Sequence, residues 1–159
     1  MCVSYAALLF WTGSISVYLL FLPLLLLLRM MLNALDGMIA AATNKQSLLG
    51  AVLNEVCDVI SDIALFTAFV LIVPVSVWLW WLLIILSVMV EFVSLAVYQA
   101  VGKRPFSGPF GKSDRAVYLG MFAIVLYMYP DLTSLIYAYV IAGIILAVLT
   151  IFNRLKPVW

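Results

Sequence analysis

Six ionisable side chains stand inside long apolar stretches of this 159-residue chain, and they are the residues best able to do chemistry. They are Arg29, Asp36, Glu55, Asp58, Asp62 and Glu91. A charge at the centre of a bilayer costs about 2.5 to 3.5 kcal/mol on insertion scales, so such residues are candidates for function. The chain has no histidine, so carboxylates and amides must supply any general base or metal ligand.

The spacing of the polar residues gives two segments one polar face each. The steps of three and four residues follow the turn of an α-helix. The first face holds Arg29, Asn33, Asp36 and Ala40, and the second holds Gly50, Asn54, Asp58 and Asp62.

The two faces meet if the segments form an antiparallel helical pair with its turn near Lys45. Both helices rise about 1.5 Å per residue, so the distance from the turn sets which residues are level. This register places Arg29 opposite Asp62, Asn33 opposite Asp58, and Asp36 level with Asn54 and Glu55.

Two explanations fit these polar residues. Buried polar side chains hydrogen-bond across membrane helices, and for Arg29 with Asp62 we favour that structural role over catalysis. The other acids have too few basic partners at their depth, and a divalent cation would neutralise them. Oxygen ligands of this kind suit magnesium, manganese or calcium. The predicted ligands are Asn33, Asp36, Asn54 and Asp58.

The elements that position these residues are membrane helices. The chain is 68% hydrophobic and 9% charged, far from the roughly 25% charged residues of a soluble domain. Apolar runs of about 20 residues cross a bilayer as helices. We therefore predict an all-α integral membrane protein with six transmembrane helices. They run approximately over Cys2 to Tyr18, Leu20 to Ala42, Leu48 to Val73, Val75 to Ala100, Arg115 to Tyr129 and Leu132 to Phe152.

Loop charges orient this layout. Seven of the eight basic residues fall on one side of the six crossings, and an excess of positive charge marks the cytoplasmic face. Both termini are therefore expected in the cytoplasm, with the polar site near that side. The net charge of +1 indicates no nucleic-acid partner. We expect one transmembrane domain over residues 1–159, and whether an N-terminal piece is missing stays open because the first segment is the weakest.

Residues 33–58 read NALDGMIAAATNKQSLLGAVLNEVCD. This stretch resembles the signature of the CDP-alcohol phosphotransferase family: DxxDGxxAR, eight residues, G, three residues, D, three residues, D. Every spacing is kept. Three positions depart from the pattern, which places the chain in a divergent branch: Asn33 and Asn54 replace aspartates, and Ala41 replaces arginine. The matching positions are Asp36, Gly37, Ala40, Gly50 and Asp58.

The resemblance implies transfer of a phosphoalcohol group from a CDP-linked lipid donor to an alcohol acceptor, with release of CMP. It implies Mg²⁺ or Mn²⁺ as cofactor, Asp36 as metal ligand, and Asp58 as both metal ligand and catalytic base. Gly37, Ala40 and Gly50 would line the nucleotide site, although glycine also serves helix packing. A homodimer is implied in the same way, and we expect the bacterial inner membrane as its location.

The loop SGPFGKSDR, which begins at Ser107, also resembles a loop of some family members. It puts Lys112 and Ser113 just before a predicted helix, with Arg115 at its start. Backbone amides and a lysine at that position could bind an anionic group of the substrate. The alternative is that the loop's charge serves topology alone.

Two other functions stay open. The lost carboxylates and arginine are compatible with a catalytically inactive relative. An ion or proton carrier could use the buried acids as a relay. The sequence lacks the paired broken helices that transporters use, which argues against the carrier.

Overall fold

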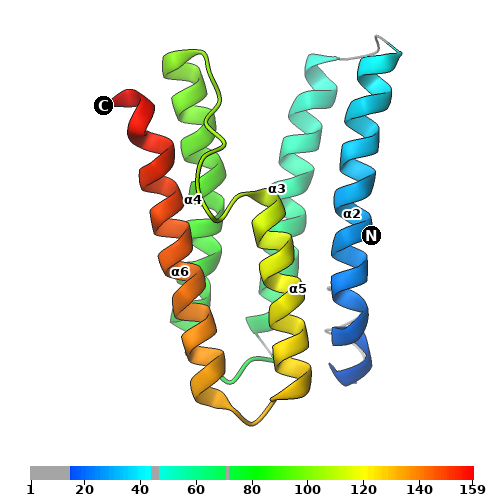
Figure 1. The fold of residues 1–159 in the computed structure, drawn as a ribbon, viewed down its shortest axis with the longest axis vertical. Helices are drawn as coiled ribbons and strands as arrows, with labels where there is room; N and C mark the ends of the chain where they lie inside the picture. Colours follow the sequence, from blue (N-terminus) through cyan, green and yellow to red (C-terminus); the bar gives the residue numbers. More distant parts are fainter. Residues whose placement is uncertain (1–14, 44–46, 71) are drawn as a thin grey trace.

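The computed structural model describes residues 15–43, 47–70 and 72–159, and all regular elements in these ranges are helical. Most of the predicted first segment and the turn at Lys45 lie outside them. Within these ranges, five long helices and a short 3-10 helix follow one another (Figure 1). They are α2 (Ile15–Ala42), α3 (Leu48–Val70), α4 (Val77–Val101), α5 (Lys112–Met128), α6 (Thr133–Leu155) and η1 (Lys156–Val158).

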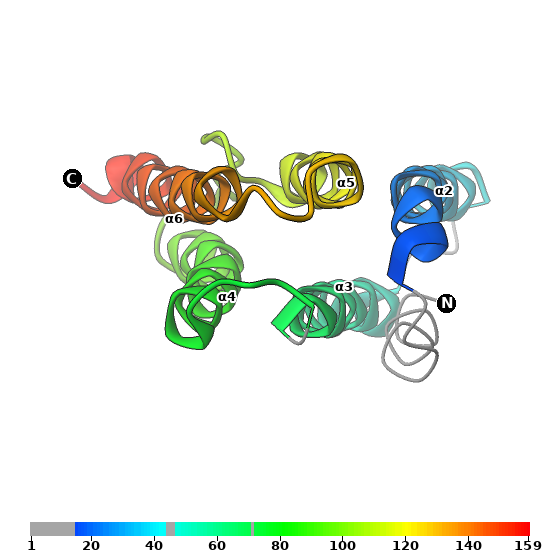
Figure 2. The same ribbon diagram turned by 90° about the horizontal axis from the view of Figure 1, so that it is seen from below.

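The helices form two layers. Seen along the bundle, α2, α5 and α6 lie in one row, and α3 and α4 lie in the other (Figure 2). Within and between these rows α2 packs against α5, α4 against α6, and α3 against α4. The tight contact of α2 with α5 uses Gly120, where an added Cβ would come within 3.4 Å of Pro23.

Polar residues and glycine fix the helix ends on the side of the α2–α3 connection. The hydroxyl of Ser47 accepts a hydrogen bond of 3.0 Å from the amide of Gly50 and so caps α3. Helix α4 ends at Gly102, whose φ of 74° lies in the left-handed region that glycine adopts without strain. The amide of Gly111 donates to Asp114 at the start of α5.

Two predicted boundaries were wrong. Helix α2 already runs from Ile15, so no break separates residues 18 and 20. Helix α5 begins at Lys112 rather than at Arg115, because Asp114 completes a cap with Gly111 and draws the preceding residues into the first turn. Lys112 and Ser113 therefore belong to the helix and do not precede it.

An aromatic cluster fills the bundle at the end away from the α2–α3 connection. Trp80 packs against Phe66, Phe69 and Phe122, with ring centroids 5.2 to 6.2 Å apart. Its indole N–H donates to the carbonyl of Phe66. Trp80 is thus buried in the core. The indole can be buried because its N–H has a hydrogen-bond partner inside the bundle.

Three helices in the described part are long and apolar enough to cross a membrane, over Leu19–Ile39, Val77–Val101 and Thr133–Val158. Helix α3 carries three acids, and α5 has only 17 residues with charges in its first turn. The prediction of an all-helical, apolar protein is confirmed. Six crossings stay a prediction, as does one domain over residues 1–159.

Candidate active site

Asp58 on α3 is the motif carboxylate with the most bonds. Its Oδ1 accepts from Arg29 Nη2 at 3.0 Å and from Asn33 Nδ2 at 2.7 Å, both on α2. Its Oδ2 accepts from Lys112 Nζ at 3.0 Å, at the start of α5. The side chain of Asp58 is buried. Donors from α2 and α5 thus converge on a carboxylate that α3 carries.

Glu55 lies one helical turn from Asp58 and shares its lysine. Lys112 Nζ is 3.0 Å from Glu55 Oε2. Arg104, in the α4–α5 loop, donates to both carboxylate oxygens of Glu55, at 2.9 and 2.7 Å. These bonds stabilise the charged form of Arg104, and they raise its pKa above the ordinary value.

Deeper in the bundle, Asp62 and Glu91 continue the network. Arg29 Nη1 and Arg115 Nε donate to the two oxygens of Asp62, at 2.8 and 2.9 Å. The carboxylate of Glu91 on α4 accepts a hydrogen bond from Arg115 at 3.0 Å and one from Arg104 at 3.1 Å. Arg154 on α6 lies 3.5 Å from the same carboxylate.

Every acid of the network is paired with basic side chains. Four acidic side chains meet five basic ones, which leaves one positive charge in excess. The inference that the acids lack basic partners was therefore wrong for Glu55, Asp58 and Glu91, because the partners come from segments remote in the sequence. The acids of the network are Glu55, Asp58, Asp62 and Glu91, and the bases are Arg29, Arg104, Lys112, Arg115 and Arg154. Asp36 has no ion pair among the described residues.

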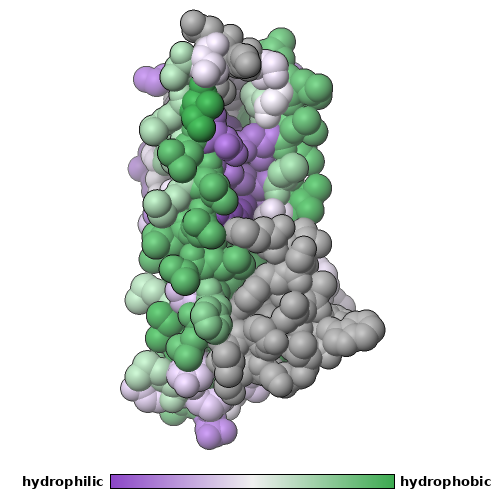
Figure 3. Space-filling view, turned by 90° about the vertical axis from the view of Figure 1, so that its right-hand side faces the viewer, coloured by the Kyte–Doolittle hydropathy of each residue, from purple (hydrophilic) through white to green (hydrophobic). Residues whose placement is uncertain are grey.

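One end of this network is open to solvent. Figure 3 shows hydrophilic side chains in a hollow between apolar flanks, in the half of the molecule that carries the α2–α3 connection. Lys112 is 34% exposed and Arg104 is 23% exposed, whereas Arg115 is only 2% exposed. Exposure falls with depth, so an anionic ligand entering the hollow would meet Lys112 and Arg104 first.

The predicted register is confirmed where α2 and α3 face one another deep in the bundle. Arg29 bonds to Asp62 and Asn33 bonds to Asp58, as their distances from the turn required. The two helices meet here through long side chains, since the main packing partner of α2 is α5.

Nearer the connection, the residues that the register places level are not joined by a polar contact in the described part of the chain. Asp36 and Asn54 are both exposed, and neither forms a hydrogen bond or ion pair within the described part of the chain. The structure thus joins Asn33 with Asp58 and leaves Asp36 and Asn54 apart from them.

The motif's small residues lie near the same end. An added Cβ at Gly37 would meet nothing within 4 Å among the described residues, so packing inside this part of the chain does not require that glycine. At Gly50 the Cβ would meet the flexible side chain of Ser47 at 2.9 Å. Ala40 belongs to the last turns of α2, and its side chain lies outside the described part.

The predicted anion-binding residues of the SGPFGKSDR loop have different surroundings. Ser113 is exposed at the start of α5. The amide of Gly111 is bonded to Asp114, and Lys112 is held by the two acids of α3. Arg115 points inward to Asp62 and Glu91. Lys112 is therefore the charged residue of this set that a ligand could reach.

The predicted metal site includes only two carboxylates, Asp36 and Asp58. Among the described residues, no group of three or more carboxylate, thiol or imidazole side chains could hold a metal ion. Both oxygens of Asp58 already accept bonds from cationic or amide donors. The ligand set of Asn33, Asp36, Asn54 and Asp58 stays a prediction.

Sequence reasoning missed two members of the site, Arg104 and Arg154. Both were counted as loop or tail charges, yet Arg154 is buried and donates to the carbonyl of Val90 and the hydroxyl of Ser94, each at 2.8 Å. The signal that could have found them is Glu91. A lone acid in an apolar helix needs basic partners, and Arg104 and Arg154 are among the few available.

Comparison with known proteins shows the family to which the chain belongs. Residues 1–152 match the CDP-alcohol phosphatidyltransferase family, and the chain belongs to that family. Inner membrane protein YnbA of Escherichia coli (strain K12) is 45% identical over 112 residues, which are 70% of this chain and 56% of that protein. The chain thus spans little more than half of this relative's length. No solved structure matches the chain.

Proposed function

We propose that this chain is an active phosphotransferase that moves a phosphatidyl-type group from a CDP-linked lipid to an acceptor hydroxyl in phospholipid synthesis. The observation that carries the proposal is the bond between Lys112 and Asp58. It puts a reachable cation next to the motif residue that resembles the family's base. A phosphate donor and a hydroxyl acceptor need these two groups side by side.

In this reaction Asp58 accepts the proton of the acceptor hydroxyl. The hydroxyl oxygen then bonds to the phosphorus that carries the lipid alcohol. The bond from that phosphorus to the oxygen of the CMP phosphate breaks, and CMP leaves with the electron pair. A nearby ammonium or guanidinium stabilises the negative charge that grows on the leaving phosphate.

The ion pairs suggest how the donor prepares the base. Lys112 and Arg29 hold Asp58 as a carboxylate in the free protein. A diphosphate entering the hollow offers Lys112 a stronger anionic partner. When Lys112 turns to the phosphate, Asp58 Oδ2 becomes free to accept a proton, while Arg29 and Asn33 keep the carboxylate in place.

The remaining site assignments belong to the same proposal. Gly37, Ala40 and Gly50 line the approach of the nucleotide. Ser113 is exposed in the first turn of α5 and faces it, whereas Arg115 acts from below through its ion pairs with Asp62 and Glu91. A Mg²⁺ or Mn²⁺ ion, when bound, supplies charge neutralisation of the diphosphate. Asp36 and Asn54 are the predicted ligands whose side chains form no hydrogen bond or ion pair within the described part of the chain.

Location and topology are also proposals. We propose six crossings in a bacterial inner membrane, with both termini and the hollow on the cytoplasmic side, and a homodimer as the assembly. The orientation rests on fewer charges than the sequence suggested, because four of the seven basic residues counted for it are paired with acids. These are Arg104, Lys112, Arg115 and Arg154.

The test is release of CMP by the purified full chain in lipid nanodiscs. CDP-diacylglycerol is supplied with a panel of small alcohols, with and without Mg²⁺ or Mn²⁺. We expect CMP with at least one alcohol, and none from Asp58→Asn. Asp131→Asn is the matched control, because Asp131 is exposed near the α5–α6 turn and should keep full activity.

Each other outcome selects a different function. CMP release by Asp58→Asn would move the base to Glu55 or Asp62. A folded protein that releases no CMP with any alcohol would be the inactive relative. Ion flux across liposomes without CMP would identify the carrier, which membership of a transferase family disfavours.

A further inference from the structure

We propose that Lys112 is a built-in cation that occupies the place of a divalent metal ion between Glu55 and Asp58. Its ammonium nitrogen lies 3.0 Å from one oxygen of each carboxylate, so it bridges the two acids as a bound cation would. The inference rests on the proposed function only for the identity of the site as the phosphotransfer site.

The bonding around the two carboxylates carries this inference. Glu55 Oε1 binds Arg104, and Glu55 Oε2 binds Arg104 and Lys112. Asp58 Oδ1 binds Arg29 and Asn33, and Asp58 Oδ2 binds Lys112. All four oxygens are engaged by donors on the protein. A metal ion could bind here only after Lys112 withdrew.

The departures from the motif agree with a lysine in the place of a metal ion. The resemblance expects a carboxylate at position 54, where this chain has Asn54 with Glu55 beside it. Helix α3 is regular throughout, so Glu55 points about 100° away from Asn54 around the axis. There it meets Lys112 and Arg104. In this chain the acid stands one residue after the motif position, where basic side chains meet it, and position 54 carries no charge.

Lys112 differs from the other cations of the network in its exposure. It is 34% exposed, whereas Arg29 is 16% exposed and Arg115 is 2% exposed. A long, flexible ammonium side chain can leave its partners without breaking the core. Lys112 is therefore the cation that can be exchanged, either for a metal ion or for a phosphate.

The test measures Mn²⁺ binding without any donor, from the loss of the free-ion signal in electron paramagnetic resonance. The variants are Lys112→Gln, Lys112→Arg and the control Lys103→Gln, which alters an exposed lysine of the same loop. Wild type should bind Mn²⁺ weakly. Removal of a positive charge next to two carboxylates should tighten binding by about tenfold or more in Lys112→Gln. Lys112→Arg and Lys103→Gln should behave as wild type.

Either of two results would overturn the inference. One is tight binding of two Mn²⁺ ions by wild type, and the other is unchanged affinity in a folded Lys112→Gln protein. If Lys112→Gln does not fold, wild type and Lys112→Arg still decide, since the inference requires weak binding in both. No turnover is needed, so failure of CMP release would reject the proposed function and leave this result standing.

Discussion

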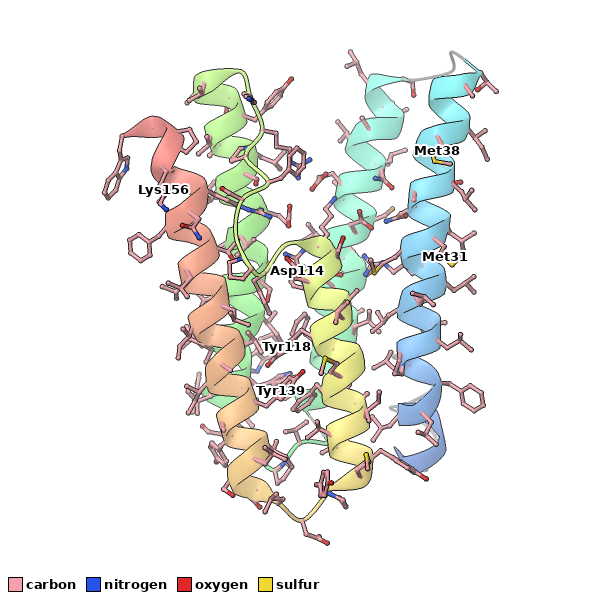
Figure 4. All side chains as sticks on the ribbon, viewed as in Figure 1. Met31, Met38, Asp114, Tyr118, Tyr139 and Lys156 are labelled. Atoms are coloured by element: carbon pink, nitrogen blue, oxygen red, sulfur yellow. The ribbon has the colours of Figure 1, made fainter. Side chains whose placement is uncertain are left out.

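The two halves of the bundle are built from the same helices in opposite ways. Toward the α2–α3 connection, α3, α4 and α5 present Asp58, Glu91 and Arg115 to a network of ion pairs. Toward the other end they present Phe69, Trp80 and Phe122 to an aromatic cluster. In Figure 4, Tyr118 and Tyr139 lie between α5 and α6 below Asp114, at the border of the two halves.

The difference shows where each half takes its stability. Aromatic rings stabilise the fold by packing against one another wherever water is excluded, and they tolerate replacement by residues of similar volume. Buried charged side chains stabilise the fold only while every partner is present, because a lone buried charge carries a large desolvation cost. The aromatic half can therefore hold the bundle together while the charged half remains free to exchange partners with a ligand.

The largest effect should follow removal of Glu91, the acid shared by three arginines. Glu91→Leu leaves Arg154 without an acidic partner among the described residues. Arg104 and Arg115 each lose one of their two acidic partners. We expect a loss of about 3 to 5 kcal/mol in the free energy of unfolding, measured by SDS titration in mixed micelles.

Glu91→Gln is the control for this prediction. It keeps an acceptor oxygen for the arginines, and it should lose less stability than Glu91→Leu. If Glu91→Leu is as stable as wild type, apolar packing holds the charged half as well, and the contrast between the halves fails.

The aromatic half should respond less to a single change. Phe122 is fully buried and its ring meets those of Phe69, Trp80 and Tyr139. Phe122→Leu keeps most of the volume and loses these ring contacts, for about 1 to 2 kcal/mol in the same unfolding titration. Its Mn²⁺ affinity should equal that of wild type. A changed affinity would show that the two halves are coupled.

A still smaller effect is expected at the border. Tyr118 and Tyr139 each donate their hydroxyl to the other's backbone carbonyl, at 3.0 and 3.1 Å. Tyr118→Phe removes one of these bonds, and such bonds between membrane helices average about 0.6 kcal/mol. The unfolding titration should show a loss of that size, and Tyr139→Phe should match it. A loss several times larger in either variant would place the pair within the charged half's cooperative network.

These contrasts explain what the sequence could predict. The steps of three and four residues set the faces of α2 and α3, and they correctly placed Arg29 with Asp62 and Asn33 with Asp58. Local spacing and one turn were sufficient for that pairing. The partners of Glu55 and Glu91 were not predictable in this way, because Arg104 and Arg154 approach from the loop before α5 and from the end of α6. Spacing within one helix contains no information about such contacts.

The last prediction concerns Asn33 and Asn54, which stand where the family motif has aspartates. Asn54 is exposed and makes no hydrogen bond or ion pair within the described part of the chain, so Asn54→Asp should change the free energy of unfolding by no more than about 0.5 kcal/mol. Asn33 differs, because its amide donates to Asp58 at 2.7 Å. In Asn33→Asp that donor becomes a carboxylate facing a carboxylate, which costs stability unless a cation enters between them.

The double variant Asn33→Asp with Asn54→Asp should therefore bind Mn²⁺ more tightly than wild type, and Mn²⁺ should restore the stability that Asn33→Asp loses. Calorimetric titration of the metal, with and without a CDP-linked donor, measures the affinity and the number of ions. Before the donor arrives, wild type should bind no more than one ion, and that ion weakly, since Asp36 and Asp58 supply only two motif charges and Asp58 is already paired. If the double variant binds no better than wild type, charge at positions 33 and 54 is not what limits the metal, and the obstacle lies in Lys112 alone.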